Sequence, residues 1–471
     1  MIHYDLIKEI LRRRCMFVGR QRELGKLEQM YENTKFEMAV VYGRRRVGKS
    51  EMIKHFCRGK KTVFFTASEN SAENNLLGFF REVSSIKTPT HMDFDNILET
   101  LVQIAKQEKI IIVIDEYPYL AKVVKHFSSL LQKFIDHNFQ YLNCMIILCG
   151  SSMSFMERQV LGYKSPLYGR RTAQFRVEPF NYAETALFVP SYSDIDKAIT
   201  YGVFGGTPYY LSRIDEKSSI GENIFNLFFQ KEALLFEEPA NLIKQELREP
   251  MTYNAVITAI ANGATKLSEI ADRIKKLPNL TETYLKNLIS LGLCVREMPV
   301  GEVSSRKGIY ALCDNMFIFW FRFVQRNLSL IHGGQNEKAH ENSMLFINDY
   351  MGKIFEDICI QYMWRNFSRL PVQPQNIGRW WGNNPLEKCE QEIDILAPTP
   401  DGKQAIFGEC KWREKVNVEV LESLKNKSQM FAEFGRKFFF IFSRGGFTDE
   451  LKKAAAADST VTLVDLESIY K

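Results

Sequence analysis

Hydrophobic residues recur in two patterns over the first part of the chain. Segments of strand length that contain a continuous apolar run occur at residues 39–42, 61–66, 109–116 and 145–150. Between them, segments 75–83 and 94–107 carry apolar residues at the spacing of one helix face. Continuous apolar runs are typical of parallel strands that are buried on both faces. Strands that alternate with helices in this way predict an α/β domain with a parallel sheet.

The pattern changes after residue 250. Segments 253–261, 266–274 and 281–291 have helical spacing, and residues 293–297 and 308–312 are short, partly apolar runs that predict two strands around a polar tip. This order predicts a winged helix-turn-helix, whose third helix would enter the DNA major groove. The candidate contacts are Thr281, Thr283, Lys286, Asn287, Arg306 and Lys307. Protein binding is an equal alternative, because the third helix carries one cation.

Two further segments are interpreted from composition. Residues 317–324, with the sequence FIFWFRFV, are expected to form core rather than a platform for stacking bases. Residues 326–341 are polar, contain a Gly-Gly pair and are expected to form a linker.

A glycine-bounded loop follows the first predicted strand and leads into an amphipathic segment. It matches G-x-x-x-x-G-K-S, the phosphate loop of nucleotide triphosphatases, in the strand–loop–helix context that this motif requires. The glycines allow backbone N–H groups to approach phosphates, the lysine reaches the β and γ phosphates, and the serine hydroxyl binds Mg²⁺. We therefore expect ATP to bind at Gly43, Arg44, Arg45, Arg46, Val47, Gly48, Lys49, Ser50 and Glu51.

The predicted strand at residues 109–116 ends in Asp115 and Glu116. Acids at the carboxyl end of a parallel strand lie where open α/β sheets bind ligands. This is a Walker B pattern, in which Asp115 would hold Mg²⁺ with Ser50 and Glu116 would act as general base toward water. The alternative is a buried strand that ends in a solvated turn.

Two residues beyond this point are candidates for sensing the γ-phosphate. Ser151 follows the strand at residues 145–150 and occupies a sensor position beside the phosphate-loop strand, or else caps a helix. The stretch Pro-Leu-Tyr-Gly-Arg, which ends in Arg170, resembles a stretch of AAA+-related phosphate-loop ATPases, and this resemblance implies that Arg170 would stabilise charge on the γ-phosphate. A solvent-exposed or structural arginine is an equal alternative. The three arginines of the loop are either solvated or add cationic attraction for the nucleotide.

The sequence F-V-G-R-Q-R-E-L at residues 17–24, a short way before the phosphate loop, resembles the AAA+-related ATPases of the archaeal ATPase family. The resemblance implies that Phe17 and Val18 lie against the adenine, although a turn before a helix would also explain the box. It also implies a helical lid, which contains Gly205-Gly206-Thr207-Pro208-Tyr209.

In the last part of the chain, a helix with Glu356 precedes a hairpin with Asp394 and a strand with Glu409 and Lys411. This arrangement resembles the PD-(D/E)XK nuclease superfamily. Residues two apart on a strand face the same side, and the carboxylates of Glu356, Asp394 and Glu409 form an oxygen set suited to Mg²⁺. Lys411 would position or deprotonate the attacking water, or stabilise phosphate charge. An exposed strand with alternating charges is the alternative.

Composition adds few constraints. The chain has 471 residues, of which 45% are hydrophobic and 25% charged, with a formal net charge of +6 that is compatible with nucleic acid. The nine cysteines show no CxxC pair, so we expect free thiols in a reducing cytoplasm. The first residues lack the apolar core of a signal peptide, and no window has the length of a membrane helix.

The predicted fold class is α/β with five parts. They are an AAA+-like P-loop ATPase core (1–180), a helical lid (181–250), a winged helix-turn-helix (251–326), a linker (327–344) and a restriction-endonuclease-like domain (345–471). The first hypothesis is an ATPase that controls a DNA-associated activity, including Mg²⁺-dependent cleavage. The second is a nucleotide-dependent switch that binds DNA or a protein through an inactive nuclease fold. A homo-oligomer is compatible with both.

Overall fold

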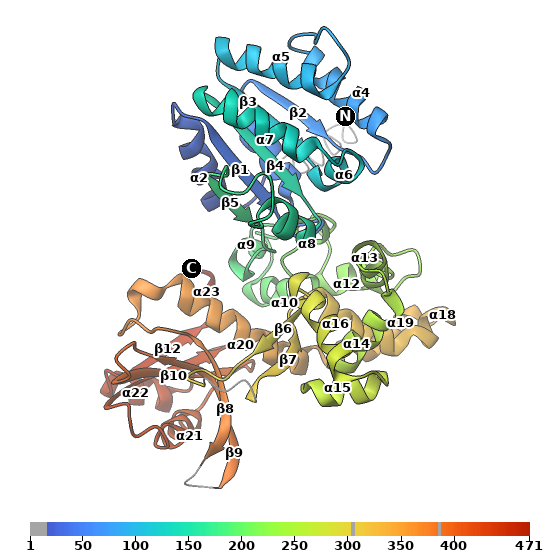
Figure 1. Ribbon diagram of the computed structural model, residues 1–471. Coiled ribbons are helices and arrows are strands. Elements are labelled where there is room, and N and C mark those ends of the chain that lie inside the picture. The colour runs from blue at the N-terminus through green and yellow to red at the C-terminus, as the bar shows by residue number, and fades with distance from the viewer. Residues whose placement is uncertain (1–16, 303–306, 385–387) are drawn as a thin grey trace, which may run out of the picture. The chain divides into compact units, whose positions relative to one another are not determined.

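The computed structural model describes residues 17–302, 307–384 and 388–471. The chain divides into two compact units (Figure 1). The first unit comprises Met1–Pro179 together with Thr207–Ser212, and the second comprises Phe180–Gly206 and Arg213–Lys471. The sequence also predicts a helix over residues 4–13, ending in a basic run, and this segment lies outside the described residues.

A five-stranded parallel sheet forms the centre of the first unit. Its strands follow the order β2-β3-β4-β1-β5, so β4 lies between the phosphate-loop strand β1 and the acidic strand β3. This confirms the parallel α/β prediction. The strands are β1 (Glu37–Tyr42), β2 (Thr62–Thr66), β3 (Ile110–Asp115), β4 (Cys144–Gly150) and β5 (Ala173–Arg176).

Helices cover both faces of this sheet, and alternate strand residues pack into two separate cores. One core combines Val40, Ile112 and Ile146 with residues of α4, α5 and α7. The other combines Val41 and Val113 with residues of α2 and α3. The two-sided burial explains why the strands read as unbroken apolar runs. The helices are α2 (Gln21–Glu32), α3 (Lys49–Cys57), α4 (Ala72–Ser84), α5 (Phe94–Gln107), α6 (Tyr117–Val123), α7 (Phe127–His137), α8 (Met153–Phe155) and α11 (Pro208–Leu211).

The second unit begins with helices and contains the predicted three-helix and hairpin segment. Strands β6 and β7 pair antiparallel, as the two short apolar runs predicted. The elements are α9 (Tyr182–Ala186), α10 (Asp194–Phe204), α12 (Ile220–Phe228), α13 (Glu238–Glu246), α14 (Pro250–Ala261), α15 (Leu267–Ile274), α16 (Pro278–Ser290), β6 (Cys294–Glu297) and β7 (Ile309–Leu312).

The candidate DNA contacts of α16 differ in exposure. Thr281 is fully buried and donates its hydroxyl to the Leu277 carbonyl, so its prediction as a DNA contact is wrong. Asn287 donates to the Tyr253 hydroxyl, and Lys286 pairs with Glu282. Thr283 is exposed and Lys307 pairs with Glu302, whereas Arg306 lies outside the described residues.

The segment expected to be a linker is helical. The Gly-Gly pair of residues 333–334 follows α18 and precedes α19, and Ile331 and Ala339 are buried. Tertiary burial of these few apolar side chains therefore orders a polar stretch. The aromatic run before it is core, as predicted, because Phe317, Phe321 and Phe323 are buried. The elements are α17 (Asn315–Phe319), η4 (Trp320–Val324), η5 (Gln325–Asn327), α18 (Leu328–His332) and α19 (Asn336–Met344).

A second five-stranded sheet organises the last part of the chain. Its order is β12-β11-β10-β9-β8, with antiparallel pairs β8–β9 and β9–β10 and parallel pairs β10–β11 and β11–β12. The elements are α20 (Ile347–Arg365), η6 (Phe367–Arg369), β8 (Gly378–Asn384), β9 (Cys389–Pro398), β10 (Gln404–Lys411), α21 (Val418–Ser428), β11 (Arg436–Ser443), α22 (Asp449–Ala457), β12 (Val461–Asp465) and α23 (Leu466–Tyr470). In the described part of the chain, no helix has the length and apolarity to cross a membrane.

We expect Phe407→Ala to destabilise the second sheet. Phe407 is fully buried on β10, and its ring contacts those of Phe431, Phe434 and Phe439. Removing a buried phenylalanine costs about 3–5 kcal/mol through lost transfer free energy and cavity formation. Urea unfolding monitored on the second unit measures the loss. The control is Thr462→Ala, which changes an exposed side chain on β12, and equal stability of the two variants would contradict the packing described.

Candidate functional site

The phosphate loop leaves β1 through Gly43 and enters α3 through Gly48. Gly48 has a φ of 87°, a left-handed conformation that glycine adopts without strain. A Cβ at Gly43 would lie 2.4 Å from the Val177 carbonyl oxygen, so no side chain fits there. Lys49 is buried and donates to the carbonyl oxygens of Gly43 at 2.8 Å and Arg44 at 2.9 Å. The loop thus curls around the lysine ammonium.

The three arginines of the loop contact other parts of the protein. The sequence alone did not decide whether they are solvated or attract the nucleotide. Buried Arg44 donates to the Thr207 hydroxyl at 2.7 Å. Arg45 donates to the Tyr119 hydroxyl at 2.7 Å, and the Arg46 guanidinium lies 4.9 Å from the centre of the Tyr209 ring. The loop is therefore held to α6 on one side and to segment 207–209 on the other.

The box before α2 also supports the loop. Arg20 is buried, has a φ of 63° and donates to the Val47 carbonyl at 2.9 Å. Phe17 stacks on His55 of α3 at 4.4 Å, while Val18 is half-buried. Adenine contact by Phe17 and Val18 stays a prediction. Arg20 was not singled out, although it stands inside the F-V-G-R sequence that was.

Glu116 and Ser151 meet at the carboxyl ends of β3 and β4. The Ser151 hydroxyl donates to the Glu116 carboxylate at 2.9 Å, and the Ser151 backbone N–H lies 3.3 Å from the same oxygen. Glu116 has a φ of 50° and donates its N–H to the Asp115 carboxylate at 3.0 Å. This strained, hydrogen-bonded arrangement fixes the direction of the Glu116 carboxylate. Ser152, not Ser151, precedes α8, which removes the helix-cap alternative for Ser151.

Lys49 and Asp115 both lie near Cys149 on β4. Burial raises the pKa of the Cys149 thiol well above its usual value, Asp115 raises it further, and Lys49 opposes this effect. Because β4 lies between β1 and β3 in a parallel sheet, the phosphate loop and the end of the acidic strand lie at the same edge of the sheet. The Ser50 hydroxyl and the Asp115 carboxylate are hard oxygen donors, which is the chemistry that Mg²⁺ requires.

Arg170 makes a structural ion pair. Its guanidinium donates to both oxygens of Asp136, at 2.7 and 2.6 Å, and to the Pro166 carbonyl at 2.9 Å. The arginine hydrogen bonds lower the pKa of the Asp136 carboxyl. This geometry favours the structural alternative over contact with a γ-phosphate.

The second candidate site lies on β9 and β10. Asp394 accepts a hydrogen bond from the Cys410 N–H at 2.8 Å, which places it beside Glu409 on the neighbouring strand. Glu409 is buried and receives Lys411 at 2.5 Å, so the two side chains share one face as predicted. Lys427 of α21, which the sequence did not indicate, lies 3.3 Å from the other Glu409 oxygen.

The pKa shifts of Asp394 and Lys411 distinguish the chemical roles that these side chains can have. Burial raises the pKa of Asp394 to about 6, and the carboxylates of Glu409 and Glu356 add to the effect. Burial alone would lower the pKa of Lys411, but Glu409 outweighs it and raises the pKa. A lysine that keeps its proton is suited to stabilising phosphate charge rather than to removing a proton from water.

Glu356 does not join this pair in a metal site. Its carboxylate binds Arg379 at 2.7 Å and Lys353 at 2.9 Å. Arg379 also pairs with Asp357 at 2.6 Å and Glu297 at 3.3 Å. Within the described residues, no three histidine, cysteine, aspartate or glutamate side chains gather as metal ligands. The residues thus do not fit the three-carboxylate Mg²⁺ site expected from the sequence, because a buried arginine holds Glu356.

Comparison with known proteins gives separate family matches for the N-terminal and the C-terminal parts of the chain. A family model described as "ATPase domain predominantly from Archaea" matches residues 17–214, and one described as "Archaea bacterial proteins of unknown function" matches residues 320–426. The uncharacterized protein MJECL04 of Methanocaldococcus jannaschii is 33% identical over 408 residues, covering 86% of this chain and 89% of that protein. The chain belongs to this archaeal ATPase family.

Two other proteins resemble parts of this archaeal-type ATPase. The uncharacterized ATP-binding protein MJ0423 of M. jannaschii is 48% identical over 46 residues, 10% of this chain and 78% of that protein. The solved structure of the Walker-type ATPase PABY2304 of Pyrococcus abyssi has a TM-score of 0.50 at 20% identity, over 65% of this chain and 96% of that one. The likeness shows an AAA+-like P-loop fold.

We expect Thr207→Val to destabilise the phosphate loop of the archaeal-type ATPase. The substitution keeps the side-chain shape and removes the acceptor of the buried Arg44 guanidinium, at a cost of about 1–3 kcal/mol. The free energy of unfolding of the first unit and the affinity for a non-hydrolysable ATP analogue should both decrease. Thr207→Ser keeps the hydroxyl and should resemble the parent. Indistinguishable Val and Ser variants would refute a role for this hydrogen bond.

Proposed function

We propose that ATP hydrolysis in the first unit controls a DNA-associated activity of the second. The observation that carries the first half is the convergence of Lys49, Asp115 and Glu116 at one edge of the parallel sheet, with Ser151 holding the Glu116 carboxylate. Lys49 binds the β and γ phosphates, and Glu116 accepts a proton from the attacking water. Ser151 orients that base.

Ser50 and Asp115 would hold Mg²⁺, which when bound would neutralise charge at the phosphates. The loop glycines contribute backbone N–H groups in the same place. The lysine ammonium lies inside the curl of the loop, which places a cationic centre in the phosphate site. Fixed positive charge at this position is what phosphoryl transfer requires.

The route of control follows from the order of the chain. The phosphate loop contacts Thr207 through Arg44 and Tyr209 through Arg46. Segment Thr207–Ser212 belongs to the first unit, but the residues on both sides of it belong to the second. A nucleotide that rearranges the loop arginines therefore pulls on a segment that is covalently joined to the second unit at both ends.

Two observations bear on what the second unit does. Asp394, Glu409 and Lys411 on adjacent strands support a nuclease-like site that acts on the DNA backbone. The pairing of Glu356 with Arg379, and of Glu409 with two lysines, supports the alternative of a nucleotide-dependent switch that binds DNA or protein without cleaving. The two functions separate by experiment.

For the first site, Lys49→Ala should abolish ATP hydrolysis, with a loss of at least about a hundredfold, because it removes the cation at the transferred phosphate. Phosphate release measured at saturating ATP is the readout. Lys54→Ala is the matched control, since Lys54 lies on the same helix and is 56% exposed. ATP turnover by the Lys49 variant at the parent rate would exclude this site.

For the second site, Glu409→Ala should abolish cleavage of linear, supercoiled or branched DNA in the presence of Mg²⁺ or Mn²⁺. The control is Glu419→Ala on α21, which removes an exposed carboxylate from the same domain. Gel analysis of the three substrates gives the result. If the parent protein leaves all three intact while it binds them in a nucleotide-dependent way, the binding switch is the correct function.

A further inference from the structure

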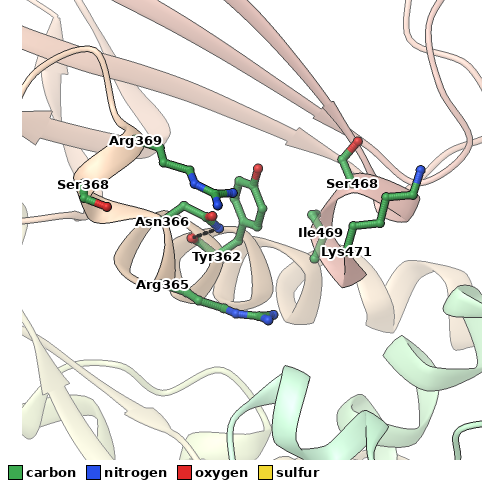
Figure 2. A pocket seen from close by; sticks show the side chains of 8 residues that line it. All are labelled: Tyr362, Arg365, Asn366, Ser368, Arg369, Ser468, Ile469 and Lys471. Carbon is green, nitrogen blue, oxygen red and sulfur yellow. Dashed lines mark hydrogen bonds between the residues drawn. The ribbon is translucent and has the colours of Figure 1, made fainter.

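A polar cavity of about 490 Å³ lies in the second unit, and none of the described residues that line it comes from β9 or β10. Its walls come from the end of α20, from η6 and from α23, as Figure 2 shows. The volume falls in the range of about 300–1,000 Å³ that small-molecule sites occupy. The side chains that line it include Arg365, Arg369, Lys471, Ser368 and Ser468 but no carboxylate.

The cations of this cavity are not neutralised by the fold. In the described part of the chain, Arg365 and Arg369 form no ion pair with a carboxylate. Lys471 pairs with Glu467 at 2.6 Å, so the net positive charge rests on the two arginines. Asp465 lies near Tyr362 and accepts the Ser468 N–H at 2.9 Å. Even with these two acids nearby, the lining itself is cationic.

Specific side-chain contacts hold the walls of the cavity in place. Tyr182 donates its hydroxyl to the Ile469 carbonyl at 3.1 Å and stacks edge-on with Tyr470 at 5.5 Å. Burial raises the pKa of the Tyr182 hydroxyl and Arg365 opposes this rise, so the tyrosine that binds the α23 wall also lies beside one of the cations. The Asn366 amide donates to the Tyr362 carbonyl at 3.0 Å, and Figure 2 shows Arg369 beside the Tyr362 ring.

A favourable interaction with the dipole of α20 does not account for all the cations that line the cavity. An arginine in the last turn of α20 interacts favourably with the helix dipole, which explains Arg365 alone. Arg369 follows the helix in η6, and Lys471 and Ser468 come from another part of the chain. Two guanidinium groups with hydroxyl donors around a hollow are the chemistry that recognises phosphate oxygens, because the guanidinium fork binds two of them at once.

We propose that this cavity binds a phosphate group, supplied either by a nucleic-acid backbone or by a free phosphorylated molecule. The site is separate from the phosphate loop and from Asp394 and Glu409. It therefore stands or falls independently of ATP hydrolysis and of DNA cleavage.

The test uses the full chain with Lys49→Ala, so that the phosphate loop does not contribute. The probes are a short fluorescein-labelled DNA duplex and inorganic pyrophosphate. The variant Arg365→Gln with Arg369→Gln is compared with Lys452→Gln and Lys453→Gln, which removes the same charge from exposed α22. Anisotropy at several salt concentrations measures DNA affinity, and hydrogen exchange of residues 362–369 and 466–471 locates either probe.

We expect the arginine variant to weaken binding of at least one probe by about tenfold or more, with less than about a twofold effect in the lysine control. For DNA, the salt dependence should flatten by about one phosphate contact per lost arginine. DNA binding that pyrophosphate does not displace assigns the backbone as the source, and displacement assigns a free phosphate.

The proposal is overturned if neither probe binds, if both variants lose affinity equally, or if the exchange of residues 362–369 and 466–471 is unchanged by the probes. Arg369→Gln alone covers the case in which the double variant fails to fold. The Arg369 side chain makes no hydrogen bond or ion pair with another described residue, so its loss should leave stability intact and still weaken binding.

Discussion

The hydrogen bond from Arg44 to Thr207 joins parts of the chain 163 residues apart. A buried guanidinium needs partners, because an unmet donor in the interior costs free energy. Satisfying it forces segment 207–212 to lie on the phosphate loop, where Pro208 packs 3.6 Å from the position of a Cβ on Gly48. The phosphate loop is therefore completed by residues that follow the first stretch of the second unit. The segment that contacts the phosphate loop is thus also the segment that connects two stretches of the second unit.

In the second unit, another buried arginine likewise links segments that are far apart in the sequence. Arg379 of β8 binds Glu356 and Asp357 of α20 and Glu297 of β6. Its backbone carbonyl also accepts the Val300 N–H at 2.9 Å, and Val300 packs into the core of the second sheet. The hairpin β6–β7, the long helix and the sheet are consequently one body. A carboxylate that is engaged in this way is costly to redirect toward a metal ion, since the arginine would remain buried without it.

Local patterns predicted the elements well, because strand and helix periodicities are written in neighbouring residues. The phosphate loop, the acidic strand and β10 all came from short motifs whose residues act together. The Arg44–Thr207 and Glu356–Arg379 pairs could not be predicted in this way. Each pair depends on which distant residue reaches the motif residue in the folded chain. Neither Thr207 nor Arg379 stands in a sequence pattern that identifies it as that partner. Segment 327–344 was misjudged for a related reason, since its helices depend on burial of Ile331 and Ala339 rather than on composition.

The alternation of the two units along the chain has a consequence for how such a protein can be rearranged in evolution. The chain enters the second unit at Phe180, returns to the first at Thr207 and leaves it again at Arg213. No single crossover between genes can therefore exchange the nucleotide-binding part as an intact body. A fragment that ends before residue 207 would lack the acceptor of Arg44, and a fragment that ends after residue 212 would carry a piece of its neighbour. The two units are expected to be inherited together.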